Sequence, residues 1–222
     1  MESIWDLLGL ELSDRVMSAT SLNDEQIRLL AEGLQPCERI VDLCIGFGNL
    51  AKVLVEQGKT VYGVDIAKKS LDYARQKVGD GKTDRLYLIK GDAQRLMFSG
   101  VDGVSCVSSL GFPNLDPVAN GIFNALKQGG YVAVTGLESS KIPQCMEHQG
   151  LELRKKYEEG SLRLTKEEIM KFVEASAKGM ITGGMGDSSE RVIAAFERQS
   201  LRISQVSSFY HDTAYFILAQ KA

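Results

Sequence analysis

The chain has 222 residues, of which 44% are hydrophobic and 25% charged, and its formal net charge is −3. This length and apolar content predict one domain with a core large enough to fold without disulfides or a structural metal. The mildly acidic balance argues against a protein that wraps nucleic acid, because phosphate binding needs a basic excess or stripe. Four scattered cysteines without a CxxC pair, and only two distant histidines, predict buried thiols in a reducing compartment and no metal site.

The first 35 residues are expected to be helical, with Asn23 and Gln26 as a capping pair ahead of an apolar run. The segment Met1 to Asp6 lacks the basic and apolar regions of a signal peptide. No later window has the apolar length of a membrane span. We therefore expect a cytoplasmic protein that makes no membrane contact.

Short apolar runs then alternate with amphipathic stretches. The runs predicted to be strands are Arg39 to Cys44, Thr60 to Asp65, Arg85 to Lys90, Gly103 to Ser108 and Tyr131 to Thr135. The helices predicted between them are Asn49 to Glu56, Lys68 to Val78 and Asp116 to Lys127. Strands that alternate with helices predict βαβ units, and hence a parallel sheet covered by helices on both faces.

The last third of the chain departs from this alternation. Its predicted elements are a charged helix from Met146 to Glu159, a second helix starting at a Thr165/Glu168 capping box, a glycine-rich stretch from Gly179 to Gly186, a helix near Ser189 to Arg198, and strands at Leu201 to Tyr210 and Ala214 to Ala219. The short connection between the two strands predicts an antiparallel hairpin. We expect one domain over residues 1–222: a helical cap (1–35), a cofactor-binding core (36–136), a helical insertion or lid (137–187), and a last helix with the hairpin (188–222).

The sharpest local motif lies where the first predicted strand, which contains Asp42, runs into Gly46-x-Gly48 and then into a helix. Glycines at such a turn let a ligand approach the backbone and the amides at the start of the helix. Asp65 follows nineteen residues after Gly46, at the end of the second strand. That spacing suits a carboxylate that accepts hydrogen bonds from ribose hydroxyls. A purely local role for Asp65, as a cap of the next helix, is the alternative.

These motifs resemble those of the class I, Rossmann-like S-adenosylmethionine-dependent methyltransferases, and the resemblance covers residues 36–136. The segment from Asp42 to Gly48 is similar to the family's first motif, except that Cys44 stands where the first glycine is usual. Asp65 matches the acid of the second strand, and Ile66 follows where the family often stacks an apolar side chain on the adenine. The segment from Leu126 to Gly130 is similar to the turn before the family's fifth strand.

The resemblance also implies roles after the third and fourth strands. Asp92 and Ala93 match a segment that contacts the adenine edge, and Val107 would line the methionine portion. A Cβ at Cys44 would narrow the space beside that portion, and we expect it to be tolerated only with a negative φ. The cofactor-binding residues implied are Asp42, Cys44, Gly46, Gly48, Asp65, Ile66, Asp92, Ala93 and Val107.

The implied fold is α/β, with a Rossmann-like, seven-stranded, mostly parallel sheet, an antiparallel last strand, helices on both faces, and helical N-terminal and mid-chain caps. The implied activity is in-line transfer of a methyl group from S-adenosyl-L-methionine, which leaves S-adenosyl-L-homocysteine. Alignment and exclusion of water dominate such a reaction, and the sequence shows no catalytic cluster. The acceptor atom, any general base and the oligomeric state stay open.

A small-molecule acceptor is favoured over nucleic acid, because the chain is acidic and the segment from Ser109 to Asn114 lacks an Asn/Asp-Pro-Pro-Tyr/Phe motif. Two alternatives are a methyltransferase-like protein that binds without transfer, and an NAD(P)-dependent Rossmann oxidoreductase. The second is considered because Gly46-x-Gly48-x-x-Ala51 also fits the dinucleotide fingerprint. The residues expected to line the acceptor pocket are Trp5, Phe112, Asn114, Met146, His148, Tyr210 and His211.

Overall fold

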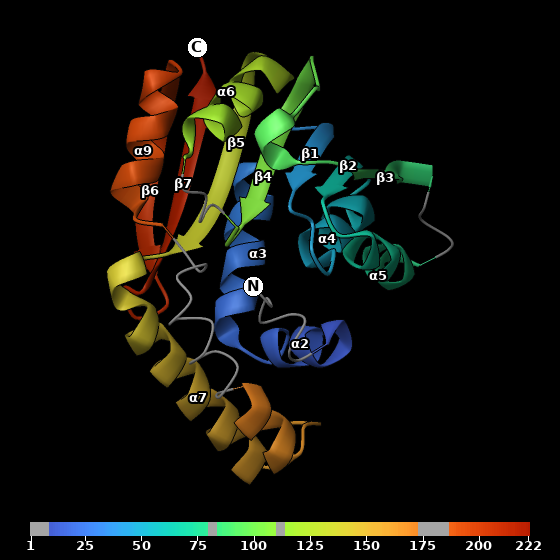
Figure 1. The fold of residues 1–222 in the computed structure, drawn as a ribbon, viewed down its shortest axis with the longest axis vertical. Helices are drawn as coiled ribbons and strands as arrows, with labels where there is room; N and C mark the ends of the chain where they lie inside the picture. The colour runs from blue at the N-terminus through green and yellow to red at the C-terminus, as the bar shows by residue number, and fades with distance from the viewer. Residues whose placement is uncertain (1–8, 80–83, 110–113, 173–186) are drawn as a thin grey trace.

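A computed structural model describes residues 9–79, 84–109, 114–172 and 187–222. They form an α/β fold around one seven-stranded sheet in the order β3-β2-β1-β4-β5-β7-β6 (Figure 1). The strands are β1 (Arg39–Leu43), β2 (Thr60–Asp65), β3 (Leu86–Lys90), β4 (Val101–Val107), β5 (Leu126–Leu137), β6 (Leu201–Phe209) and β7 (Ala214–Lys221). Strands β1 to β5 pair in parallel, whereas β7 is antiparallel to both β5 and β6. The predicted fold class, with its reversed last strand and terminal hairpin, is confirmed.

Helices cover the sheet on both faces. The described α-helices are α2 (Leu10–Met17), α3 (Ser21–Gly33), α4 (Asn49–Glu56), α5 (Lys68–Val78), α6 (Asp116–Ala125), α7 (Ile142–Glu158) and α9 (Ser189–Arg198), and the 3₁₀ turns are η2 (Ala93–Arg95) and η3 (Ser139–Lys141). One face packs against α3, α4 and α5, and the other against α6 and α9. Among the described residues, no helix is both long and apolar enough to cross a membrane.

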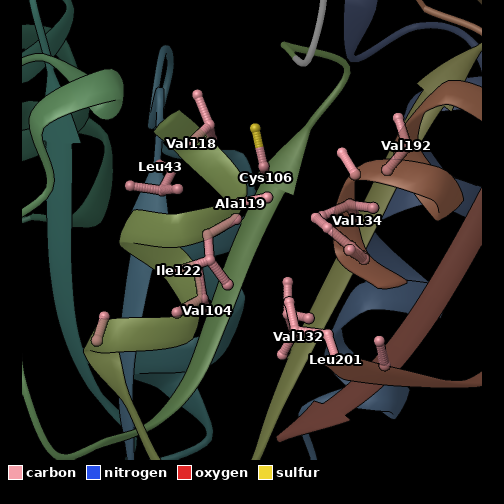
Figure 2. Packing of buried hydrophobic residues seen from close by; sticks show 14 of the residues in the cluster. Leu43, Val104, Cys106, Val118, Ala119, Ile122, Val132, Val134, Val192 and Leu201 are labelled. Carbon is pink, nitrogen blue, oxygen red and sulfur yellow. The ribbon is translucent and has the colours of Figure 1, made fainter. Parts of the chain in front are cut away.

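The central strands are buried on both faces, which explains their nearly continuous apolar sequences. In β1, Ile40 joins the cluster under α3 to α5, whereas Val41 and Leu43 join the cluster under α6 and α9. Figure 2 shows this second cluster, in which α6 and α9 lie over β1, β4 and β5. The residues labelled there are Leu43, Val104, Cys106, Val118, Ala119, Ile122, Val132, Val134, Val192 and Leu201.

The predicted limits of α4, α5 and β2 agree with the structure, and those of every strand except β5 agree within two residues. β5 begins at Leu126, five residues before the predicted start. Leu126 pairs with Val101, and the register then jumps so that Tyr131 pairs with Gly103. The expected turn is therefore an irregularity inside β5, and α6 ends at Ala125 instead of at residue 127.

Two predictions about helix starts were tested with opposite results. The capping pair Asn23 and Gln26 is wrong, because α3 already begins at Ser21 and both residues lie within it. The Thr165/Glu168 capping box is confirmed: the Thr165 N–H donates to Glu168 Oε2 at 2.7 Å, and the Glu168 N–H donates to Thr165 Oγ1 at 3.2 Å. Helix α7 begins at Ile142, before the predicted Met146, because a proline fits its first turn.

The additional helices lie at the edge where the parallel strands end. In Figure 1 the arrowheads of β4 and β5 point toward α2 and α7, and α7 extends away from the sheet. A polar network joins α2 to α5: Lys77 Nζ lies 2.5 Å from Asp14 Oδ1, and Tyr73 donates to Asp14 Oδ2 at 2.9 Å. Burial and the Asp14 charge raise the pKa of Tyr73 to about 12. This arrangement fixes α2 beside the carboxyl ends of the strands.

Candidate functional site

The loop after β1 forms the centre of the candidate site. Ile45 donates its N–H to the carbonyl of Val64 on β2 at 3.1 Å, so the loop stays beside β2. Cys44 has a φ of +53°, and the expectation of a negative φ is wrong. Left-handed backbone costs a non-glycine residue about 1–2 kcal/mol. Contact of the Cys44 thiol with Cys106 on β4, within a buried apolar cluster, offsets this strain.

The two glycines of this loop are required for different reasons. Gly46 has a φ of +54°, and an added Cβ would meet only the carbonyl oxygen of Cys44, at 3.6 Å. Gly48 has a φ of +77° at the start of α4, and an added Cβ would lie 2.8 Å from the Cβ of Ala74 on α5. Among the described residues, an added side chain at Gly46 would therefore be uncrowded, whereas Gly48 permits two helices to pack closely.

Asp65 connects the loop to the end of β2. Its Oδ2 accepts a hydrogen bond from the Gly46 N–H at 3.0 Å, and its Oδ1 accepts one from the Ala67 N–H at 2.8 Å. The local role considered for Asp65 is therefore present as an Asx turn, but the carboxylate also reaches across to the glycine loop. A carboxylate has about four acceptor positions. Asp65 thus keeps acceptor capacity for hydroxyl groups of a ligand.

Asp42 lies beneath this loop and is only 1% exposed. The Ser105 hydroxyl on β4 donates to Asp42 Oδ1 at 2.8 Å. Burial, with the charge of Asp65 as a smaller contribution, raises the pKa of Asp42 to about 7, although the Ser105 hydrogen bond opposes this shift. Asp42 is therefore partly protonated near neutral pH.

The remaining predicted residues follow β2, β3 and β4 along one edge. Ile66 is 70% exposed directly after Asp65. The Gly91 N–H donates to the Asp65 carbonyl at 3.0 Å and so brings the segment after β3 beside β2. Asp92 begins η2 by accepting from the Gln94 N–H at 2.9 Å, and Ala93 is buried. Val107 is half-buried at the end of β4.

Helix α3 contributes to the same edge through two residues that sequence reasoning had assigned to capping. Gln26, which is 2% exposed, donates through Nε2 to the hydroxyl of Ser108, directly after β4. Asn23 accepts from Asn49 Nδ2 at 3.3 Å, at the first residue of α4. The available signal was that both are polar residues inside an amphipathic helix, where a buried amide needs a distant partner.

The structure brings together three of the expected acceptor-pocket residues. The rings of His148 and His211 stack with centroids 4.1 Å apart, and the Tyr210 ring lies 6.5 Å from that of His148. They line a cavity of about 480 Å³ between α7 and the turn from β6 to β7. Met146 packs beside this turn between two apolar clusters.

Other expected pocket residues do not join this cavity. Asn114 lines a separate cavity of about 170 Å³ with Arg191 and Arg198 of α9. Trp5, Phe112 and the stretch from Gly179 to Gly186 lie outside the described residues.

The strand order distinguishes between the two Rossmann-like alternatives. A dinucleotide-binding sheet is parallel with the order 3-2-1-4-5-6, whereas here an antiparallel β7 lies between β5 and β6. Residues 40–130 match a family model described as a methyltransferase domain. This match, which covers less than half of the chain, and the fold of solved methyltransferases support a class I, Rossmann-like methyltransferase.

Curated relatives match the chain over limited segments. An uncharacterised methyltransferase of Geobacillus sp. (strain WCH70) is 40% identical over 53 residues, which are 24% of this chain and 23% of that protein. A demethylmenaquinone methyltransferase of Beutenbergia cavernae is 32% identical over 99 residues, which are 44% of this chain and 38% of that protein. The matched segments thus span less than two fifths of either relative.

A solved structure extends the likeness of fold to most of the chain. It is the geranyl diphosphate C-methyltransferase from Streptomyces coelicolor A3(2), in complex with Mg²⁺, geranyl diphosphate and S-adenosyl-L-homocysteine. The TM-score is 0.66 over 91% of this chain and 80% of that chain, with 12% sequence identity. At that identity the comparison concerns the fold alone.

Proposed function

We propose that this chain is an S-adenosyl-L-methionine-dependent methyltransferase that acts on a small-molecule acceptor. The observation that carries the proposal is Asp65, whose carboxylate is tied to the glycine loop and keeps acceptor positions beside the exposed Ile66. A ribose diol and an adenine face are the ligand groups that this pair suits. The missing side chain of Gly46 would let such a ligand approach the backbone of the loop closely.

The cofactor would supply a methyl group already attached to a cationic sulfur, so the leaving group needs no protonation by the protein. The residues of the chain would bind and orient. Asp65 accepts from the ribose hydroxyls, Ile66 and Asp92 contact the adenine, and Val107 lines the methionine portion. Asp42 supports the loop from beneath instead of reaching the surface. Residues 1–35 and 137–187 would form the cap that excludes water.

Two observations support a small acceptor over nucleic acid. The chain carries a net charge of −3, which repels a phosphate backbone. The cavity of about 480 Å³ beside His148 and His211 has the size of a small-molecule site. It lies at the carboxyl edge of the sheet, where ligands of open α/β folds bind.

Isothermal titration calorimetry with S-adenosyl-L-methionine, S-adenosyl-L-homocysteine and NAD tests the cofactor. We expect the sulfur nucleosides to bind and NAD to bind much more weakly. Asp65→Ala should lose about 1–3 kcal/mol of binding, or roughly 5- to 150-fold in Kd, because two ribose hydroxyls lose their acceptor. Asp72→Ala, which removes an exposed carboxylate of α5, is the matched control and should leave Kd unchanged.

Preferential binding of NAD would refute the proposal and favour the oxidoreductase alternative. Unchanged affinity in Asp65→Ala would remove this residue from the site. Tight binding of S-adenosyl-L-methionine without turnover on any member of a broad acceptor panel would favour the non-catalytic binding protein.

A further inference from the structure

The cavity between α7 and the turn from β6 to β7 is built from three segments that lie far apart in the sequence. Ser21 comes from the start of α3, His148, Leu151 and Lys155 come from α7, and His211 comes from the turn. The turn is unusual, because residues 210–212 all have positive φ, between 48° and 59°. This backbone presents the His211 imidazole against that of His148 on α7.

One of the two carboxylates in the wall of this cavity, Glu152, already accepts from several protein donors. Glu152 accepts from the Ser21 N–H at 2.9 Å and from the Ser21 hydroxyl at 3.0 Å. It also accepts from the Tyr210 hydroxyl at 3.2 Å and pairs with Lys156 Nζ at 2.8 Å. These donors outweigh burial and lower the pKa of Glu152, so it stays ionised and engaged. Glu152 therefore offers little acceptor capacity to a ligand.

Glu159 also lines the cavity, and the other polar groups left to meet a ligand are hydrogen-bond donors. The Lys155 ammonium lies 3.9 Å from Glu159 Oε1, in an exposed pair that is worth little in water. In the part of the chain that the structure describes, no side-chain hydrogen bond engages the His148 or His211 ring. Each imidazole supplies at least one N–H, and two when protonated. Leu151, which is 57% exposed, adds an apolar surface beside them.

We propose that the methyl acceptor is a small organic anion whose carboxylate or phosphate group is held in this cavity by Lys155, His148 and His211. This inference rests on the proposed methyltransferase function. Anionic oxygens accept from ammonium and imidazole donors, and such charge-assisted hydrogen bonds are stronger than neutral ones. The exposed leucine would contact the apolar part of the same molecule.

The cavity is close enough to the proposed cofactor site, at the carboxyl ends of the parallel strands, to serve as part of the acceptor site. Ser21 precedes Gln26 by five residues on α3, which is about 7.5 Å along a helix axis. Gln26 contacts Ser108, the residue directly after Val107. An anion held at the cavity could therefore extend a reactive atom toward the end of β4 while its charged group stays bound.

Binding of defined probes to the full chain, saturated with S-adenosyl-L-homocysteine, tests the cavity. Benzoate and phenyl phosphate represent the two anionic groups, and benzyl alcohol is the neutral analogue. By titration calorimetry we expect at least one anion to bind about tenfold more tightly than the alcohol, and the preferred anion identifies the group. Lys155→Met and His211→Asn should each weaken anion binding about fivefold or more. Asparagine is chosen because it tolerates the positive φ at that position.

Lys171→Met removes an exposed lysine outside the cavity and is the matched control, which should bind the anions normally. All three variants should keep the wild-type affinity for S-adenosyl-L-homocysteine. Equal binding of acid and alcohol, absence of saturable anion binding, or full anion affinity in Lys155→Met and His211→Asn would overturn the proposal.

A turnover assay separates this inference from the proposed function. Acceptor candidates are supplied as pairs, each an acid and its neutral amide, and release of S-adenosyl-L-homocysteine is measured. We expect turnover of acids only, with a raised KM and little change in kcat in Lys155→Met. Turnover confined to amides would overturn the anionic acceptor but keep the methyltransferase. Loss of cofactor binding, or no turnover at all with anion binding intact, would instead refute the methyltransferase function on which the acceptor assignment rests.

Discussion

Replacing Asp42 by asparagine should change how the folding stability of the chain depends on pH. The folded-state pKa of Asp42 is about 7, against 3.8 for an ordinary carboxyl, chiefly because the side chain is buried. Between these two pH values the unfolded chain has released the proton that the folded chain retains. Stability therefore falls as pH rises through this range. At about 1.36 kcal/mol for each pKa unit, the penalty above pH 7 approaches roughly 4 kcal/mol.

The Asp42→Asn variant cannot ionise at this position and resembles the protonated form of the carboxyl. Its amide oxygen can still accept from the Ser105 hydroxyl, which lies 2.8 Å from the carboxylate oxygen of the wild type. We therefore expect the stability of the variant relative to wild type to increase by about 3 kcal/mol between pH 5 and pH 8. Urea unfolding of both proteins at four pH values in this interval measures this difference in stability. The other titratable groups are the same in both proteins, so their contributions cancel in the difference.

Ser105→Ala provides an internal check on the same carboxyl. The Ser105 hydroxyl stabilises ionised Asp42, so its removal should shift the midpoint of the pH dependence upward. A difference between wild type and Asp42→Asn that stays constant from pH 5 to pH 8 would refute the reasoning, because it would mean that Asp42 ionises alike in the folded and unfolded chains.

Three further substitutions test the loop and the cap by urea unfolding. Gly48→Ala should lower the free energy of unfolding by about 2–4 kcal/mol, because the positive φ and a clash with α5 act together. Gly58→Ala is the control: its φ is +83°, but no described atom lies within 4 Å of an added Cβ, so it should cost only about 1 kcal/mol. Equal losses in the two variants would contradict the clash. Cys44→Val should destabilise by about 1–3 kcal/mol, since a β-branched residue resists a φ of +53°, whereas wild-type stability would mean that the loop relaxes. Lys77→Met should cost about 1–3 kcal/mol by leaving the buried Asp14 without its cation. Retained stability would show that Asp14 does not need this partner.

Much of the sheet could be predicted from the sequence, because its central strands are buried on both faces and appear as short apolar runs between amphipathic helices. The limits of α4 and α5 also follow from local signals, namely the glycine loop before α4 and helical periodicity in α5. β5 was less predictable because its first residues pair with β4 across a register jump. Strand pairing of that kind depends on a partner strand and leaves no periodic signal in its own sequence.

The candidate site was predictable where the chemistry lies within one segment. Asp65 and the glycine loop were identified by spacing, and the structure joins them by a hydrogen bond of 3.0 Å. The conformation of Cys44 was not predictable, because it depends on a backbone bond to β2 and a thiol contact to β4. His148 and His211 could be named separately, but only the tertiary fold stacks their rings.

The first turns of α3 make polar contacts with three separate parts of the chain. Ser21 bonds Glu152 of α7, Asn23 bonds the first residue of α4, and Gln26 bonds the residue after β4. These positions are spread over roughly 200° around a helix with 100° per residue. Helix α3 therefore contacts α7, α4 and the end of β4 on different sides. Asn23 and Gln26 are buried, and each would cost about 1–3 kcal/mol if a shift of α3 removed its partner. These directional hydrogen bonds therefore add to the apolar packing of Leu30 and Ala31 in fixing the position of α3.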